Sequence, residues 1–429
     1  MANMQFLINN LWVAIAALLV FTMTISVGML EVGELGERMN RSLLKTMLIM
    51  GTALVMMAII GFNIAFAPTI DGVIGNPFYV QGLLLGSFSK SANSVNFINT
   101  IWWSMMPQYF GTGLSTTTYF LFETAFASVT LALVGVIILR KVKLSSFFLF
   151  SIIYFVIIWT LPAAWIWNPT GWLYLLGMRD FAGGLVVHAS AGAVGIAILI
   201  RIWQEERKSG LKISMQEQIN LNERWLVLAI LFLIIGWFGF NPGSALAFNS
   251  DVIMIAVATF LAAGAAMLST MGVKYLTSKE NPGLLYAVNG ILMGLIVITP
   301  LAGFVDPGSA ILLGLLAGPI FIAGEKYFSR FKWFTDPVGL LPGHFLGGIF
   351  GVMMIAFFSE NAYAAASGNP TLPNGLLFGG GMLALHQLGI EIFGIVVVLI
   401  TVFVLSYITI TAISHMTNGL LTDCAKKQN

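Results

Sequence analysis

The chain has 429 residues; 9% of them are charged, 58% are hydrophobic, and the formal net charge is +2. A soluble domain carries roughly 25% charged residues, so this composition excludes a water-soluble globular protein. The small net charge gives no reason to expect nucleic acid as a partner. The single cysteine, Cys424, excludes an internal disulfide and does not indicate a metal cluster.

Apolar stretches of about twenty residues recur along the chain, and a stretch of that length crosses roughly 30 Å of hydrocarbon as an α-helix. The N-terminal MANMQFLINN has no lysine or arginine, and the apolar run after it is too long for a signal peptide, so we expect a retained first span. The pattern predicts an all-α polytopic membrane protein with eleven transmembrane helices, at approximately residues 10–30, 44–67, 115–139, 145–166, 181–201, 224–247, 252–275, 284–303, 308–325, 338–359 and 389–415.

The basic residues predict the orientation of these helices. An odd number of spans places the termini on opposite sides, and with the N-terminus outside only Lys90 and Arg179 of the twenty Lys and Arg residues lie outside. The other eighteen fall on the inner side: Arg38, Arg41, Lys45, Arg140, Lys141, Lys143, Arg201, Arg207, Lys208, Lys212, Arg224, Lys274, Lys279, Lys326, Arg330, Lys332, Lys426 and Lys427. Because cytoplasmic loops are enriched in Lys and Arg, we expect a cell-membrane protein with its N-terminus outside and its C-terminus in the cytoplasm.

The fifth and tenth predicted spans share a spaced pattern. DFAGGLVVHASAGAVG begins at Asp180 and DPVGLLPGHFLGGIFG begins at Asp336; aligning the aspartates pairs Gly183 with Gly339, His188 with His344, Gly192 with Gly348 and Gly195 with Gly351. Five spans in each half is an odd number, so the two copies cross in opposite directions and form an inverted five-plus-five repeat. We expect a single domain with repeat 1 at about 10–203, repeat 2 at about 224–359, an additional eleventh helix at about 389–415 and a short cytoplasmic tail at 416–429.

Helix geometry places the two repeat-related histidines near the membrane centre. Eight helical residues rise about 12 Å, so His188 and His344 each lie about that far in from opposite faces of a core roughly 30 Å thick. A histidine at that depth normally faces a partner or a water path. One alternative is two unrelated buried histidines bonded to carbonyls; another is a metal site, but HExxH and a second cysteine are missing. A pair of imidazoles that donate and accept hydrogen bonds suits a small polar solute in an apolar tube better.

Four segments have a recognisable combination of motifs: DFAGGLVVH, GWFGFNPGSA at 236–245, FETAFA at 122–127 and GHFLGGIFG. They resemble the ammonium transporter family, which includes the Amt, Mep and Rh proteins, and the resemblance extends over nearly the whole chain. It implies ammonium and methylammonium as substrates, no cofactor, no enzymatic activity, a homotrimer with a pore in each subunit, and a PII-type cytoplasmic regulator. The tail GLLTDCAKKQN lacks the acidic extension often found in the family, which argues against regulation through the tail.

The resemblance also implies an outer recruitment site. By position, Trp167 and Ser244, with Phe126, match the residues that bind ammonium there. Physically, the indole π face attracts a cation and a hydroxyl oxygen accepts one of its N–H bonds. Trp167 as an interfacial belt residue beside Trp165 and Trp172 is the alternative.

Further positions follow the same resemblance into the pore. Phe126 and Phe240 match a stacked pair that closes the pore, although each alone reads as core packing, and Trp237 matches a pore-lining position. Asp180 matches an aspartate at the outer end of the fifth span, where we expect it to accept backbone N–H bonds while its charge favours a cation above. His386 and His415 are expected to lie outside the pathway.

Three positions depart from the family pattern. Glu123 stands where a glutamine is usual, and a carboxyl at that depth must be protonated, paired or wetted; it could modulate selectivity or proton handling. Gly339 replaces a usual aspartate, and Phe345 a common glycine. The departures at Gly339 and Phe345 concern the packing around His344.

The expected mechanism is ammonium binding at the outer site, deprotonation, and NH3 conduction along the histidine pair, with separate proton transfer left open. Two alternatives are an ammonium sensor, which usually appends a signalling domain that is not found here, and an Rh-like neutral gas facilitator, which should lack the Trp167–Ser244 site. An intramembrane enzyme is disfavoured because no nucleophile and base occur together.

Overall fold

The computed structural model describes residues 4–36, 39–79, 112–138, 141–210, 221–331, 333–334, 336 and 338–422. Within these residues, eleven helical segments are long and apolar enough to cross a membrane: Met4–Leu35, Met39–Phe66, Thr116–Ile138, Leu144–Ile166, Gly184–Ser209, Glu223–Ala245, Ser250–Ser278, Leu284–Leu301, Pro307–Phe328, Leu340–Phe358 and Gly381–Met416. Each overlaps one predicted span, so the predicted all-α polytopic architecture is confirmed. The predicted features at Arg38, Lys90, Arg140, Lys212, Lys332, Cys424, Lys426 and Lys427 lie outside the described residues.

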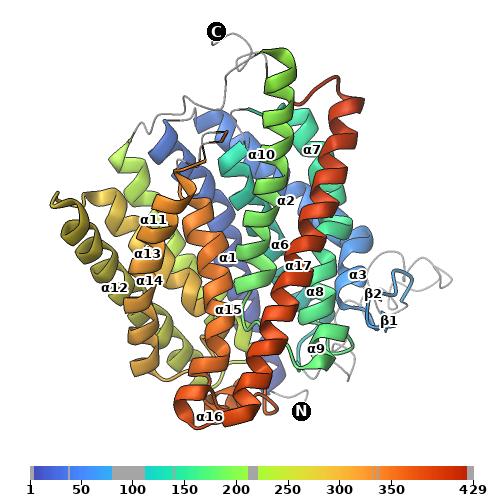
Figure 1. Ribbon diagram of the computed structural model, residues 1–429. Helices are drawn as coiled ribbons and strands as arrows, with labels where there is room; N and C mark the ends of the chain where they lie inside the picture. Colours follow the sequence, from blue (N-terminus) through green and yellow to red (C-terminus); the bar gives the residue numbers. More distant parts are fainter. Residues whose placement is uncertain are drawn as a thin grey trace.

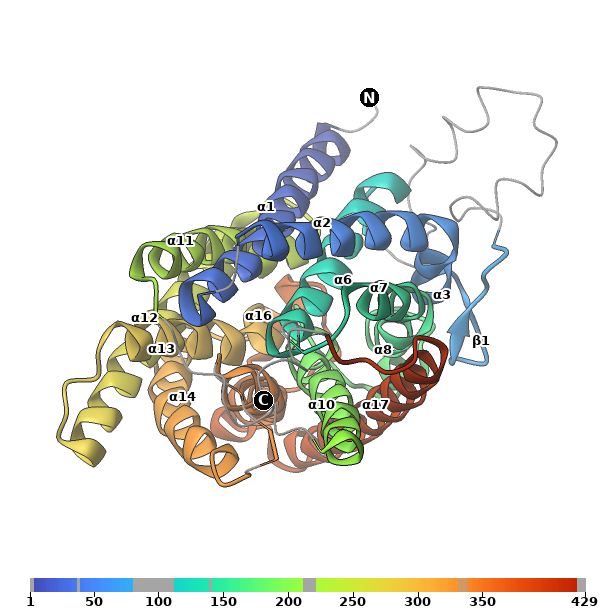
Figure 2. The ribbon, with the colours of Figure 1, turned by 90° about the horizontal axis from the view of Figure 1, so that it is seen from above.

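The helix axes are roughly aligned between two faces of a bundle, with the N-terminus at one face and the C-terminus at the other (Figure 1). We call these the N-terminal face and the C-terminal face. On one side of the bundle lie α11 (Glu223–Phe240), α12 (Ser250–Ser278), α13 (Leu284–Ile298) and α14 (Pro307–Phe328), and on the other lie α7 (Leu144–Ile153), α8 (Thr160–Ile166) and α17 (Gly381–Met416) (Figures 1 and 2). Between these groups run α1 (Met4–Leu35), α6 (Thr116–Ile138), α10 (Ser190–Ser209) and α15 (Leu346–Phe358).

Burial separates the central helices from the peripheral ones. Nearly every residue of α6 is buried, including its threonines and serines. In contrast, α17 exposes large apolar side chains along its length, among them Leu383, Val396 and Ile400. Such a surface is stable against lipid or another protein but not against water, as expected for the lipid-facing side of a membrane protein.

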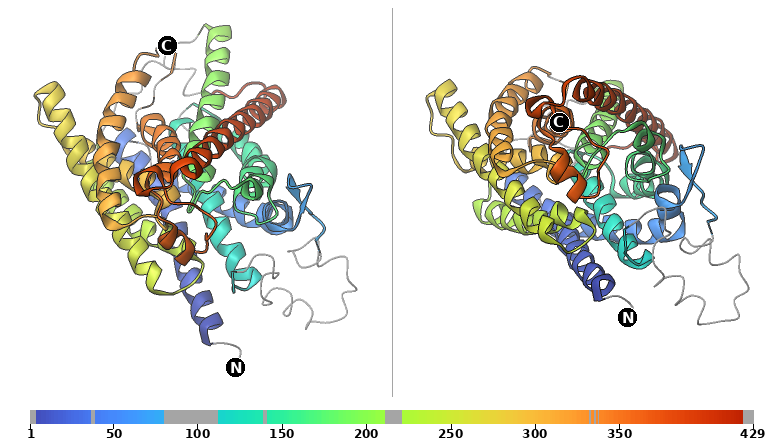
Figure 3. Two further views of the ribbon diagram at one scale, coloured as in Figure 1. Left: turned by 60° about the horizontal axis from the view of Figure 1, so that its bottom comes forward. Right: turned by 90° about the horizontal axis from the view of Figure 1, so that it is seen from below.

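Short elements close the N-terminal face (Figure 3). The strands β1 (Thr69–Ile70) and β2 (Ile74–Gly75) form an antiparallel hairpin. The indole of Trp165 and the backbone N–H of Trp172 donate to carbonyls of Val73 and Gly72 in its turn, at 2.7 and 3.0 Å. The hairpin therefore fixes the end of α8 and the start of α9 (Trp172–Leu176). Two further short helices lie at this face, α16 (Asn361–Ala366) and η9 (Leu376–Phe378). The remaining helical elements lie within the spans: α2 (Met39–Met56), η1 (Met57–Gly61), α3 (Phe62–Phe66), η3 (Tyr154–Ile158), η6 (Pro242–Ala245) and η7 (Thr299–Leu301).

The two repeated sequence segments adopt the same local structure. Each begins with a glycine in the left-handed region, Gly183 at φ +107° and Gly339 at φ +68°. Each continues as one wide π-helical turn, η4 (Gly184–Ala189) and η8 (Leu340–Phe345), before an α-helix follows. In both turns the histidine is the fifth residue. Because π-turns are rare and concentrate at functional sites, their matched occurrence singles out these two segments.

Glycines allow the two repeated segments to touch. A Cβ on Gly348 would lie 2.3 Å from the carbonyl oxygen of Gly184, and one on Gly192 would lie 2.5 Å from the Cβ of Phe345. Phe345, which departs from the family pattern, thus packs directly on a glycine of the other repeat. The missing side chains let η4 and η8 approach closely enough for their histidines to meet.

Candidate functional site

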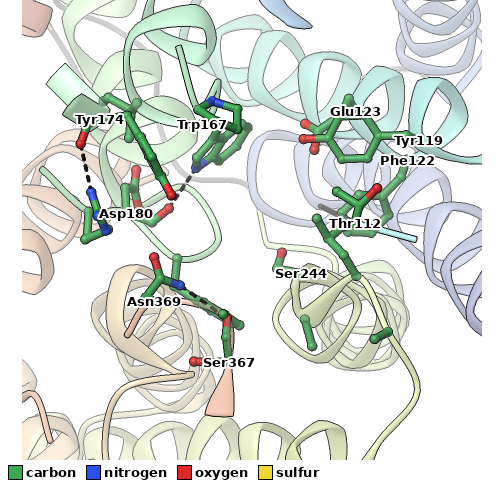
Figure 4. A pocket seen from close by; sticks show the side chains of 18 of the residues that line it. Thr112, Tyr119, Phe122, Glu123, Trp167, Tyr174, Asp180, Ser244, Ser367 and Asn369 are labelled. Carbon is green, nitrogen blue, oxygen red and sulfur yellow. Dashed lines mark hydrogen bonds between the residues drawn. The ribbon is translucent and has the colours of Figure 1, made fainter. Parts of the chain in front are cut away.

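A vestibule of about 370 Å³ opens in the N-terminal half of the bundle. Its walls come from α6, the segment after α8, the segment after η6, and the residues around α16. Figure 4 shows Trp167, Ser244 and Glu123 facing this space from three different elements. Phe248, next to the vestibule rim, donates its backbone N–H to the side chain of Asn9 at 3.0 Å, which ties the rim to the start of α1.

A hydrogen bond fixes the orientation of Trp167, whose side chain lines the vestibule. Its Nε1 donates to the backbone oxygen of Asp180 at 2.7 Å. The Asp180 carboxylate accepts four backbone N–H bonds at 2.6 to 3.0 Å, from Gly183, Gly184, Leu185 and Val186. Burial raises the pKa of Asp180, while these four donors oppose the rise. With its oxygens occupied by the start of η4, Asp180, which also lines the vestibule, has the geometry of a structural cap.

Ser244 contributes an oxygen to the vestibule. Its hydroxyl donates to the carbonyl of Phe240 at 2.8 Å, so the lone pairs of its oxygen can accept a bond from a solute. The serine is only partly buried. Trp167 and Ser244, predicted to act together, therefore line the same space.

Two stacked rings separate the vestibule from the bundle centre. Phe126 and Phe240 lie 4.2 Å apart between ring centroids, with an interplanar angle of 29°. Phe126 also meets Trp167 edge-on at 5.8 Å. Both phenylalanines are almost fully buried, so the described side chains leave no open channel past them in this conformation.

The histidine pair lies directly behind the phenylalanines. The His188 ring stacks against Phe240 at 5.7 Å and against Trp237 at 5.5 Å. Its Nδ1 lies 3.1 Å from Nδ1 of His344, so one ring donates this hydrogen bond and the other accepts it. Nε2 of His188 is buried without a hydrogen-bond partner. Because one Nδ1 donates and the other accepts, the two rings hold opposite tautomers.

The surroundings of Trp237 are polar behind the ring. Its Nε1 donates to the hydroxyl of Thr299 at 3.1 Å, and Thr299 bonds in turn to Asn241, which bonds to Thr259. All four residues are buried. This network holds the indole flat against His188.

A second, small cavity begins on the other side of His344 and is lined by Leu30, Val136, Leu292, Phe321 and Gly339, among others. Near this end Asp336 caps η8 through the backbone N–H groups of Leu340 and Leu341, at 3.0 and 2.7 Å. Burial raises the pKa of Asp336 to about 6 against the opposing effect of those donors and of Lys141. Vestibule, phenylalanine pair, histidine pair and this cavity thus form one line through the bundle.

Sequence reasoning missed several buried carboxyl groups, among them those of Glu31, Glu34 and Glu391. Glu31 pairs with Lys45 and accepts a bond from Ser42, and Glu34 is completely buried without a hydrogen bond to either oxygen. Glu391 on α17 accepts bonds from the Arg179 backbone and from Gln387. All three lie in membrane-spanning helices, Met4–Leu35 and Gly381–Met416; for Glu391, an ionisable residue in an apolar run was a signal that could have identified it.

The other predicted positions lie off this line. His386 and His415 are exposed on α17 and line neither the vestibule nor the cavity below His344. Among the described residues, no group of three or more His, Cys, Asp or Glu side chains could hold a metal ion.

Comparison with known proteins gives a consistent result. The model of the Ammonium Transporter Family matches residues 11–427. A putative ammonium transporter of Methanothermobacter thermautotrophicus is 30% identical over 404 residues, covering 93% of this chain and 90% of that protein. Ammonium transporter Amt1 of Archaeoglobus fulgidus is 30% identical over 384 residues, covering 89% and 86%.

Solved structures share the fold. Saccharomyces cerevisiae Mep2 has a TM-score of 0.80 at 24% identity, covering 98% of this chain and 91% of that chain. The structure of a sensor Amt protein has a TM-score of 0.79 at 26% identity, covering 99% and 98%.

Proposed function

Because this chain belongs to the ammonium transporter family, we propose that it binds NH4+ in the vestibule, removes one proton, and conducts NH3 along His188 and His344. The observation that supports this most directly is the order of the side chains. A cation-binding vestibule is followed by a closed apolar stack and then by a pair of hydrogen-bonding rings. Each part suits one stage of moving ammonium without its hydration shell.

The vestibule suits a small cation. The indole of Trp167, which lines the vestibule, supplies a π surface, and cation–π contacts contribute about 0.5–2 kcal/mol depending on desolvation. Ser244 adds an acceptor oxygen, and the nearby Asp180 contributes negative charge. These groups favour a cation that also donates hydrogen bonds.

The phenylalanine pair favours the neutral species. Moving an ion from water into an apolar interior costs of order 20 kcal/mol before relaxation, and no charged group lies between the Phe126–Phe240 stack and the histidines among the described side chains. Desolvation also makes an ammonium group easier to deprotonate. Potassium has no proton to lose, so the same stack excludes it.

The histidine pair then replaces part of the lost hydration. NH3 donates and accepts hydrogen bonds, and neutral imidazoles in opposite tautomers match both roles. The stacked Trp237 and Phe240 keep the surrounding wall apolar. On the far side NH3 regains a proton from water in the second cavity.

The test is uptake of labelled methylammonium by the purified full-length protein in liposomes. We expect the double variant His188→Ala, His344→Ala to lose saturable uptake, while His386→Ala, an exposed histidine of α17, keeps it. Size-exclusion profiles check that each variant is intact. Saturable uptake at the wild-type rate by the double variant would refute conduction along the histidines.

The remaining expectations are part of the same proposal. The vestibule faces the outside, with the N-terminus out and the C-terminus in, as the distribution of Lys and Arg indicates. The protein assembles as a homotrimer in the cell membrane, and a PII-type regulator binds its cytoplasmic face. Cysteine labelling of loops from each side, and the mass of the purified assembly, test these points.

A second candidate is an ammonium sensor, since a sensor Amt protein covers 99% of this chain at 26% identity. A sensor needs the vestibule but not an open pathway. Binding of ammonium without measurable flux through the wild-type protein would favour this alternative over transport.

A further inference from the structure

The vestibule contains a carboxyl group that the proposed transport steps do not use. Glu123 lies on α6, three residues before Phe126, and its side chain lines the vestibule together with Trp167 and Ser244 (Figure 4). Only 5% of its surface is exposed. It therefore lies about one helical turn before Phe126, on the vestibule side of the phenylalanine pair.

One oxygen of this carboxyl has no hydrogen-bond partner. Tyr119, one turn earlier on α6, forms a side-chain hydrogen bond with Glu123. The atom Oε2 is buried and has no hydrogen-bond partner. A buried acceptor without a partner is unusual in a folded protein, and the residue that carries it lines a cavity large enough for several water molecules.

The other charged groups of the vestibule are already engaged. Asp180 accepts four backbone N–H bonds, and the Arg179 guanidinium donates to the carbonyls of Tyr174 and Met178 and to the hydroxyl of Thr371. Tyr174 and Tyr119 complete the titratable groups that line the vestibule in the described part of the chain. Glu123 is the carboxyl among them with an unengaged oxygen.

We propose that Glu123 is the proton acceptor for ammonium, which deepens the proposed transport function and rests on it. An NH4+ ion held by Trp167 and Ser244 donates a hydrogen bond to Oε2 of Glu123. One N–H bond breaks, an O–H bond forms on Oε2, and the electron pair of the broken bond stays on nitrogen. NH3 then passes Phe126 and Phe240, and vestibule water removes the proton from Glu123 to restore the carboxylate.

The surroundings favour this transfer over a lasting ion pair. Burying two charges costs several kcal/mol for each ion even after relaxation, whereas NH3 beside a neutral carboxylic acid leaves no charge to desolvate. The side chains of Ser244 and Trp167 can hold the cation but cannot accept its proton near neutral pH. The same is true of a glutamine in place of Glu123. A glutamate at this position therefore adds a chemical step, not only an attraction.

The experiment compares wild type with Glu123→Gln, which keeps the size and one acceptor oxygen but cannot take up a proton. Initial rates of methylammonium uptake into liposomes are measured against substrate concentration at external pH from about 5 to 8, with rates expressed per reconstituted protein. Positioned acid–base groups contribute about 10²–10⁴-fold. We expect the maximal rate of the glutamine variant to fall at least about tenfold at pH 7, with a smaller change in KM.

The pH profile separates proton transfer from a structural or electrostatic role. In wild type, the maximal uptake rate should fall at low pH because a protonated Glu123 cannot accept a proton from ammonium. This fall at low pH, the acid limb of the profile, should be absent in Glu123→Gln. Glu123→Asp, which retains a carboxyl, should keep the limb. Glu280→Gln, an exposed carboxyl of the C-terminal face, should behave as wild type.

Two outcomes contradict the proposal. A glutamine variant with a raised KM but an unchanged maximal rate would show that Glu123 only attracts the cation, and an unchanged pH profile would exclude a proton-accepting role. If wild type itself shows no saturable uptake, it is the transport function that fails. Normal size-exclusion behaviour and thermal stability confirm that a slow variant is folded.

Discussion

Replacement of Gly348 by alanine should impair both stability and transport, because this glycine sets the distance between the two repeated segments. A Cβ at this position would lie 2.3 Å from the carbonyl oxygen of Gly184 and 2.8 Å from the amide nitrogen of Ala189. Both atoms belong to the backbone of η4, so no flexible side chain can move aside. Ordinary contact begins near 3.4 Å, and η4 must therefore shift by about 1 Å, the difference between 3.4 and 2.3 Å.

The shift has two consequences of different size. Overpacking in a close-packed interior costs about 1–3 kcal/mol of folding free energy. Displacement of η4 also moves His188, whose Nδ1 must stay near the 3.1 Å that separates it from His344. A misplacement of about 1 Å can reduce the rate of a positioned site by about 10²-fold, so we expect uptake to fall more than stability.

The assay pairs thermal denaturation in detergent with methylammonium uptake in liposomes. Gly264→Ala is the matched control, because a Cβ on Gly264 meets nothing within 4 Å and alanine is a better helix former than glycine. The control should be at least as stable as wild type and equally active. Wild-type stability and uptake for Gly348→Ala would show that the contact between the repeats is not as close as the structure indicates.

Two further predictions concern buried carboxyl groups near the C-terminal face. Glu34→Leu should raise the thermal stability by about 1–3 kcal/mol, because it removes a completely buried carboxyl with no hydrogen bond; a lower melting temperature would mean that the carboxyl has a stabilising partner. Burial raises the pKa of Asp336 from 3.8 to about 6, so the folded state binds its proton more tightly than the unfolded state and stability is lost as pH rises from about 4 through 6. Asp336→Asn should remove this pH-dependent part of the free energy of unfolding, which is at most about 2–3 kcal/mol. Melting temperatures that depend on pH between 4 and 7 as steeply as in wild type would contradict this prediction.

The spans were predictable because the bilayer imposes a length on every apolar run. The last helix begins earlier than predicted, at Gly381 and not at about 389. In the structure Gln387 is buried and donates to the carbonyl of Gly177 at 2.9 Å and to Glu391. A tertiary partner for a polar side chain cannot be read from local sequence, so the helix was cut short.

The candidate site was partly predictable for a related reason. Histidine and glycine spacing identified the repeated segments, and family motifs identified Trp167, Ser244, Phe126 and Phe240. Neither source shows that Oε2 of Glu123 is unengaged or that Glu34 is buried without a partner. Those properties depend on which groups from distant segments occupy the neighbouring space.

The contact between the histidines follows from the repeat itself. Each histidine is held by its own half, since Asp180 and Asp336 cap the turns in which His188 and His344 lie. The bond between Nδ1 atoms forms only if both capped turns are correctly built and the glycines between them permit contact. Gly339 fits this logic: at φ +68° a glycine adopts the left-handed conformation at lower cost than the aspartate usual in the family, so the turn that places His344 keeps its geometry although the second carboxyl is lost.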